Sequence, residues 1–169
     1  PPNCAGRRRC VQMPGGKGIF PGRTVRENLQ LVNWLNDNLS AAEIRSRMSE
    51  VYEIFPILRT RVNEPAGLLS GGEQQQLSLA QAFLMQPRLL LIDELILGLS
   101  PAVVGQLLDI VSDIHSRGVT IIVVEQSVNV ALNLSTRAVF LEKCEVRFDG
   151  TTAELLARTG HPLASYFKA

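Results

Sequence analysis

The chain has 169 residues, which suits one domain and is short for two. Its 17 basic and 16 acidic side chains leave a formal net charge of +1, so charge gives no reason to expect a nucleic-acid partner. Hydrophobic residues make up 46% of the chain, which is typical of a globular protein, and no apolar run has the roughly 18 residues of a membrane-spanning helix. The spacing of Cys4, Cys10 and Cys144 matches no common zinc site and indicates free thiols.

The first third of the chain predicts a loop and then two helices. Proline, glycine and arginine dominate the first 22 residues, which we expect to form a loop with one short strand at 10–13. Two pairs with the spacing of a capping box then predict helices. The first pair is Thr24 and Glu27, for a helix to about Val32; the second is Ser40 and Glu43, for a helix that Pro56 and Ile57 interrupt.

Beyond residue 70, helices alternate with strands. Apolar runs such as Leu89–Ile92 and Thr120–Val124 predict strands that are buried on both faces, as in a parallel sheet. The other predicted elements are a helix over 74–85, a helix over 101–117, a short helix over 128–134, a hairpin of 138–142 and 145–148, and a helix over 152–158. This alternation predicts an α/β domain with a largely parallel sheet.

Two acidic residues end the first of these strands. Open α/β sheets bind ligands at the carboxyl ends of their strands, so Asp93 and Glu94 are placed for chemistry. The Asp93 carboxylate suits a Mg²⁺ ion, and Glu94 suits the base that orients or deprotonates a water molecule. Two acids that merely end a strand are the structural alternative.

A glycine pair precedes the predicted helix over 74–85. In Ser70-Gly71-Gly72-Glu73, the glycines allow close approach of a ligand, and the helix that follows offers free N–H groups to an anion. The Ser70 hydroxyl can add one donor. A glycine turn that only caps a helix is the alternative.

Together the motifs resemble an ABC-type ATPase, most of all the ATP-binding subunits of branched-chain amino acid importers. The order that carries the resemblance is Leu-Ser-Gly-Gly-Glu-Gln-Gln, one helix, Leu-Leu-Leu-Ile-Asp-Glu, a Gly-Leu-x-Pro turn, and a strand that ends in Val-Glu-Gln. Further support comes from Ile19-Phe20-Pro21, from residues 24–29 and from Phe55-Pro56. The resemblance covers nearly all of the chain from Met13 onward.

The resemblance implies a role for each motif. Ser70, Gly71, Gly72 and Glu73 belong to the signature motif, which contacts the γ-phosphate of ATP held by the opposite subunit of a head-to-tail dimer. Asp93 corresponds to the Walker B aspartate that holds Mg²⁺, and Glu94 to the catalytic glutamate. Gly98 and Leu99 fall in the D-loop. Gln126 falls at the switch position. Most ABC ATPases have histidine at that position, but glutamine also occurs there in this importer branch.

Some of the family pattern is absent. The 169 residues hold no Gly-x4-Gly-Lys-[Ser/Thr]. The one Gly-Lys pair, Gly16-Lys17, has Val11 at the position of the first glycine and Gly18 at the position of the serine or threonine. We therefore expect the N-terminal portion of the fold, with the Walker A loop, to be missing and the chain to begin just before the Q-loop. Other departures are Gly15 at the Q-loop position, Leu95-Ile96 after the glutamate, and Gln81 in place of an arginine.

These observations predict one incomplete ABC ATPase domain of the P-loop NTPase fold. Its expected parts are an irregular segment with a Q-loop remnant (1–22), a helical signature subdomain (23–86) and a Walker B core (87–169). The resemblance implies an ATP-hydrolysing subunit of an importer for branched-chain amino acids, which uses ATP and Mg²⁺ and has no nucleic-acid partner. Its implied partners are a second ATPase subunit and transmembrane permeases on the cytoplasmic face of the plasma membrane. The alternative is a non-catalytic module that lends its signature motif to a Walker-A-bearing partner.

Overall fold

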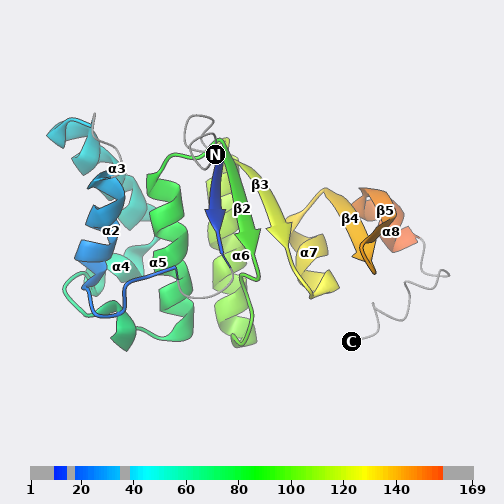
Figure 1. The fold of residues 1–169 in the computed structure, drawn as a ribbon, viewed down its shortest axis with the longest axis horizontal. Coiled ribbons are helices and arrows are strands. Elements are labelled where there is room, and N and C mark those ends of the chain that lie inside the picture. The colour runs from blue at the N-terminus through cyan, green and yellow to red at the C-terminus, as the bar shows by residue number, and fades with distance from the viewer. Residues whose placement is uncertain (1–9, 15–17, 35–38, 158–169) are drawn as a thin grey trace. The chain divides into compact units, whose positions relative to one another are not determined.

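A computed structural model describes residues 10–14, 18–34 and 39–157 of the protein (Figure 1). Two compact units make up the fold, one as far as Ile122 and the other from Val123 onward. The elements of the first are β1 (Cys10–Met13), α2 (Val25–Trp34), α3 (Ala41–Ile54), α4 (Pro56–Thr60), the 3-10 turn η1 (Ala66–Leu68), α5 (Gly71–Leu84), β2 (Leu89–Asp93), α6 (Pro101–Ser116) and the start of β3 (Thr120–Val124). After β3 come α7 (Val128–Leu134), β4 (Arg137–Glu142), β5 (Glu145–Thr151) and α8 (Thr152–Ala157).

The predicted parallel sheet is present, with strand order β1-β2-β3. Strands β1 and β2 run parallel, in a register that pairs Cys10 with Leu89 and Met13 with Ile92. The inward side chains of these strands, among them Met13, Leu90 and Ile92, are buried. The short strand expected at 10–13 and the strand expected at 89–92 are therefore confirmed, and both belong to one sheet.

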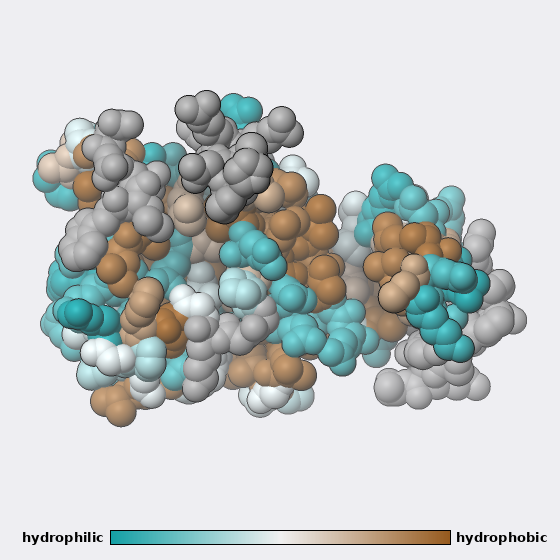
Figure 2. Space-filling model, in the orientation of Figure 1, coloured by the Kyte–Doolittle hydropathy of each residue, from teal (hydrophilic) through white to brown (hydrophobic). Residues whose placement is uncertain are grey.

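Strand β3 differs from its prediction. Its β-branched sequence predicted burial on both faces, but Ile122 is 50% exposed and Val124 is 60% exposed. The strand begins beside β2, where the Thr120 amide donates to the Arg88 carbonyl at 3.0 Å. Burial of a strand depends on the layers that cover its faces, and composition alone does not reveal those layers. Figure 2 shows apolar side chains at the surface in this region.

Among the described residues, capping boxes begin four helices. In each, a serine or threonine hydroxyl accepts the amide of a glutamate three residues on, and the glutamate carboxylate accepts the amide of the capping residue. The pairs are Thr24 with Glu27, Ser40 with Glu43, Ser70 with Glu73, and Thr151 with Glu154. The first two confirm the predicted helix starts.

The predicted interruption after α3 is only half right. Helix α3 ends at Ile54, and Pro56 then opens α4, in which Ile57 is helical. Proline is well accepted in the first turn of a helix, because the amide that it lacks has no intrahelical partner there. Helix α5 begins at Gly71, three residues before the predicted start, because Ser70 caps it.

The second unit contains the predicted hairpin of β4 and β5. Lys143 and Cys144 form its turn with φ angles of 50° and 63°, the left-handed region that tight hairpin turns require. Phe148 and Leu155 form a small core on one side of this hairpin. Val139, Leu141 and Val146 are exposed, and Figure 2 shows apolar side chains over the hairpin. The end of the predicted helix over 152–158 lies outside the described residues.

Within the part of the chain that the structure describes, no helix combines the length and the apolar character needed to cross a lipid bilayer.

Acid is expected to destabilise the fold through its capping boxes. Hydrogen bonds from Thr24 lower the pKa of Glu27, and hydrogen bonds from Ser40 lower the pKa of Glu43. A carboxylate with a lowered folded-state pKa stabilises the protein above its unfolded pKa of about 4.3, and this contribution is lost as the pH falls through the folded value. The temperature of the thermal midpoint should therefore decrease as the pH is lowered below about 4.3.

Substitution of the capping glutamates tests this expectation. Glutamine can keep the cap but does not titrate, so Glu27→Gln and Glu43→Gln together should reduce the acid dependence of the thermal midpoint, measured by circular dichroism from pH 7 to pH 3. Glu53→Gln, on the exposed side of α3, is the matched control. An equal change in the control would contradict the role of the caps.

Candidate functional site

The signature turn, residues 70–73, joins the 3-10 turn η1 to helix α5. The Ser70 Oγ accepts the Glu73 amide at 3.4 Å, and the Glu73 Oε2 accepts the Ser70 amide at 2.8 Å. The Ser70 carbonyl accepts the amide of Gln74 at 2.9 Å. The amides of Gly71 and Gly72 come before the first residue that can bond within the helix. The turn can therefore offer these two amides and the Ser70 hydroxyl proton to an anion.

The two glycines meet different surroundings. Gly71 is exposed, and a Cβ atom built on it would lie 3.3 Å from Leu99 Cδ2. Gly72 is buried, and its Cβ would lie 2.3 Å from Val103 Cγ1 on α6. Side-chain carbons do not approach so closely, so Gly72 is required by the packing of α5 against α6. Close approach of a ligand was the reason that the sequence suggested, and packing supplies a second one.

An ion pair holds the carboxylate of Glu73. The Arg61 Nε lies 2.9 Å from Glu73 Oε1, so the two carboxylate oxygens have different partners. Burial raises the pKa of Glu73, but the hydrogen bonds from Ser70 and the pairing with Arg61 outweigh burial and leave the pKa below its ordinary value. Glu73 is therefore ionised at neutral pH.

Backbone hydrogen bonds tie the segment before the signature turn to the loop before α2. The Gly67 amide donates to Pro21 at 2.9 Å and the Ala66 amide to Arg23 at 2.8 Å. Further along, the Val25 amide donates to Glu64 at 3.0 Å. The signature turn is thus supported by a segment more than 40 residues away in sequence.

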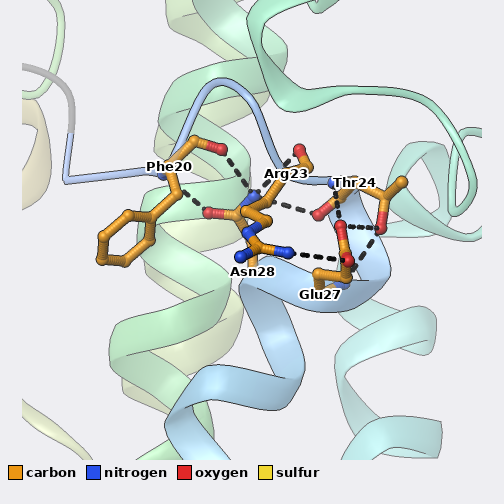
Figure 3. Close-up of polar contacts among 5 residues, drawn as sticks. All are labelled: Phe20, Arg23, Thr24, Glu27 and Asn28. Atoms are coloured by element: carbon orange, nitrogen blue, oxygen red, sulfur yellow. Dashed lines mark hydrogen bonds and ion pairs between the residues drawn. The ribbon is translucent and has the colours of Figure 1, made fainter.

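Buried Asn28 holds the same loop from inside (Figure 3). Its Oδ1 accepts the Phe20 amide at 2.8 Å, and its Nδ2 donates to the carbonyls of Phe20, Arg23 and Thr24. The Asn28 carbonyl in turn accepts Gln81 Nε2 at 3.0 Å. Gln81, one of the departures from the family pattern, therefore links α5 to α2.

Asp93 and Glu94 lie together at the carboxyl end of β2, and both are half-buried. Glu94 has a φ of 50°, a left-handed conformation that costs about 1–3 kcal/mol in a residue other than glycine. The chain then turns through buried Leu95 and through Gly98, whose φ is 75°. This turn leads to Leu99, which packs beside Gly71. The end of β2 is thus connected to the signature turn through the predicted D-loop.

A groove of about 520 Å³ adjoins the signature turn. Ser70, Gly72 and Glu73 line one side of it. Apolar residues at the junction of α3 with α4, and residues of α6, line the rest: Ile54, Pro56, Ile57, Val103, Gln106, Asp109 and Ile110, with Gln76 of α5.

The predicted site residues fall into three places. The four signature residues form one turn, and the two acids end one strand. Gln126 follows β3 in the second unit and is exposed. Gly15 and Cys4 lie outside the described residues. Among residues 10–14, 18–34 and 39–157, no group of three or more His, Cys, Asp or Glu side chains could hold a metal ion.

Sequence reasoning assigned no role at the turn to Arg61, Val103 or Asn28. Arg61 and Val103 contact residues 12 and 31 positions away, so no local motif marks them. The Asn28 side chain bonds residues only four to eight positions before it, within or beside the motif at 24–29, but the motif alone did not reveal these contacts. The capping box at Ser70 and Glu73 did carry a local signal, since it has the same spacing as the pairs at Thr24 and Ser40.

Comparison with known proteins agrees with these motifs. The sequence profile of the family described as ABC transporter matches residues 4–97. The chain is 38% identical over 150 residues to the high-affinity branched-chain amino acid transport ATP-binding protein BraG of Pseudomonas aeruginosa, which covers 89% of this chain and 63% of BraG. It is 33% identical over 157 residues to a branched-chain amino acid transport ATP-binding protein named LivF in Archaeoglobus fulgidus, which covers 92% of this chain and 65% of LivF.

A solved structure shares the fold. CbiO1 from Clostridium perfringens, part of the ABC transporter complex CbiONQ, aligns with a TM-score of 0.78 over 90% of this chain and 61% of CbiO1, at 20% sequence identity. The chain therefore spans a little under two thirds of the length of these relatives. The predicted α/β fold of the P-loop NTPase class is confirmed, and the chain belongs to the ABC transporter family.

Proposed function

We propose that the chain acts in an ABC importer, with branched-chain amino acids as the transported class, and presents its signature turn to ATP held by a second ATPase subunit. The observation that carries this proposal is the turn at Ser70, Gly71 and Gly72, where two backbone amides and a hydroxyl are gathered on a fixed support. The similarity to BraG and LivF supports the transported class.

The chemistry of the site residues fits ATP and Mg²⁺. Amide and hydroxyl donors suit an anionic phosphate, and the Asp93 carboxylate is the oxygen ligand that Mg²⁺ accepts, with phosphates and water completing its coordination. A bound Mg²⁺ ion would neutralise phosphate charge. Glu94 would orient a water molecule and take its proton, and its left-handed backbone conformation is a sign of a functional position. We assign Gln126 to the switch position of the family pattern.

The proposed setting is peripheral, on the cytoplasmic face of the membrane beside transmembrane permease subunits. A non-catalytic module that only completes a partner's ATP site is the alternative.

Mixing with a partner ATPase tests the shared part of both possibilities. The chain is combined with an ABC ATPase that carries a Walker A loop and a glutamine in place of its catalytic glutamate, so that ATP persists. Size-exclusion chromatography should show a complex with Mg-ATP and separate chains without it. A complex that forms equally well without ATP, or none with ATP, would contradict the proposal.

Ser70→Ala should weaken this ATP-dependent association by at least about tenfold, because one charge-assisted hydrogen bond and one helix cap are lost. Ser40→Ala is the matched control, since it removes the hydroxyl of an identical capping box on α3. We expect the control to bind the partner as the unmodified chain does. Equal losses in both variants would assign the effect to stability alone.

A further inference from the structure

Arg61 connects the end of α4 to the signature turn. It caps α4, with its amide donating to Ile57 at 3.1 Å, and its carbonyl accepts the amide of Glu64 at 2.9 Å. Its side chain reaches Glu73 at 2.9 Å and Glu64 at 2.8 Å. The backbone around it is fixed as well, because Arg26 donates to Val62 at 2.9 Å. The guanidinium is therefore held in place from both sides.

The negative charge of Glu73 lies near the proposed phosphate donors, and the contact with Arg61 offsets this charge. Its carboxylate lies in the first turn of α5 and bonds the Ser70 amide, so it is one turn from the donors proposed for a phosphate. A lone negative charge there would repel an anionic ligand. The Glu73 side chain is 17% exposed, so water screens this charge only in part. Arg61 supplies the opposite charge and also fixes the direction of the carboxylate.

We propose that Arg61 is a positioning residue of the ATP-binding turn, which neutralises Glu73 and holds it on the Ser70 amide so that the phosphate of a partner's ATP can approach Ser70 and Gly71. This inference rests on the proposed function. Arg61 itself acts through Glu73, and the ion pair connects the position of α4 to the state of the signature turn.

The test measures the dissociation constant for the Walker-A-bearing partner, at saturating Mg-ATP, by fluorescence anisotropy. Arg61→Gln should raise this constant about tenfold at low salt, because an uncompensated carboxylate remains near the phosphate. The effect should shrink toward 1 M salt, where the screening length is about 3 Å. Salt also screens the Arg61–Glu73 ion pair itself, so thermal unfolding at the same salt concentrations separates lost stability from lost binding.

Charge removal from Glu73 should rescue the defect. Arg61→Gln with Glu73→Gln should bind within about threefold of the unmodified chain, because glutamine can still accept the Ser70 amide in a capping box. Glu64→Gln is the matched control, since it removes the other partner of Arg61 and leaves Glu73 paired. It should leave binding unchanged. Thermal unfolding of each variant separates folding defects from binding defects.

Two results would overturn the role of Arg61 and leave the proposed function standing. The first is an Arg61→Gln chain that binds the partner like the unmodified chain, and the second is a double variant that binds the partner as weakly as Arg61→Gln does. If the unmodified chain itself does not associate in the presence of Mg-ATP, the proposed function fails, and the role of Arg61 fails with it.

Discussion

Replacement of Gly72 by alanine is expected to lower the free energy of unfolding by about 1–3 kcal/mol, the usual cost of overpacking a close contact. The new methyl group would lie 2.3 Å from Val103 Cγ1. Val103 is branched at Cβ, and a helix allows such a side chain essentially one rotamer, so it cannot turn away. The start of α5 must therefore move relative to α6, and the signature turn moves with it.

A second substitution makes this prediction specific. Val103→Ala removes the obstructing atom, so Gly72→Ala with Val103→Ala should recover most of the loss caused by the first change. Gly105→Ala on α6 is the control, because nothing lies within 4 Å of its Cβ position. This control should stabilise the helix by about 0.5–1 kcal/mol. Equal behaviour of Gly72→Ala and Gly105→Ala in thermal unfolding would contradict the packing argument.

The second large effect concerns Glu94. It is measured in a fusion protein in which the Walker A part of an ABC importer ATPase is joined to this chain ahead of Cys10. If this chain hydrolyses ATP, Glu94→Gln should lower kcat by about 10²–10⁴, the range found when a general base is lost. Binding of ATP should change little, because Gln keeps the size and polarity of the side chain. Glu53→Gln on α3 is the control for loss of one carboxylate.

The outcome also separates the two proposed functions. Retained hydrolysis in Glu94→Gln would refute the role of that residue as base. A joined chain that binds ATP and associates but never hydrolyses would support the non-catalytic module. The physical cause would then be sought at Leu95 and Ile96, which stand where the family pattern has proline and serine.

Local signals in the sequence were enough to predict most of the helices and strands. The Thr24–Glu27 and Ser40–Glu43 spacings predict helix starts because a cap involves only residues three apart. The Leu-Leu-Leu-Ile-Asp run predicts β2 because a strand between two helical layers is apolar on both sides. The effect of Pro56 was harder to predict from the sequence, because proline can end one helix and begin the next.

Burial and long-range contacts could not be predicted from the sequence alone. The run from Thr120 to Val124 has the composition of a buried strand, yet its burial depends on elements that pack against it, and Ile122 is half exposed. Likewise, the need for glycine at position 72 depends on Val103, which is 31 residues away in the sequence printed above. The candidate site could therefore be located from its motifs, while the residues that support it required the fold.

Photocleavage with vanadate is the most direct measurement of where the signature turn lies in an assembled site. Vanadate trapped with Mg-ADP at the γ-phosphate position cuts, on irradiation, the backbone that it touches. With the Walker-A-bearing partner present, the account predicts cleavage of this chain at Ser70, and no cleavage of it without the partner. Cleavage of the partner alone, with residues 70–73 intact, would contradict the account.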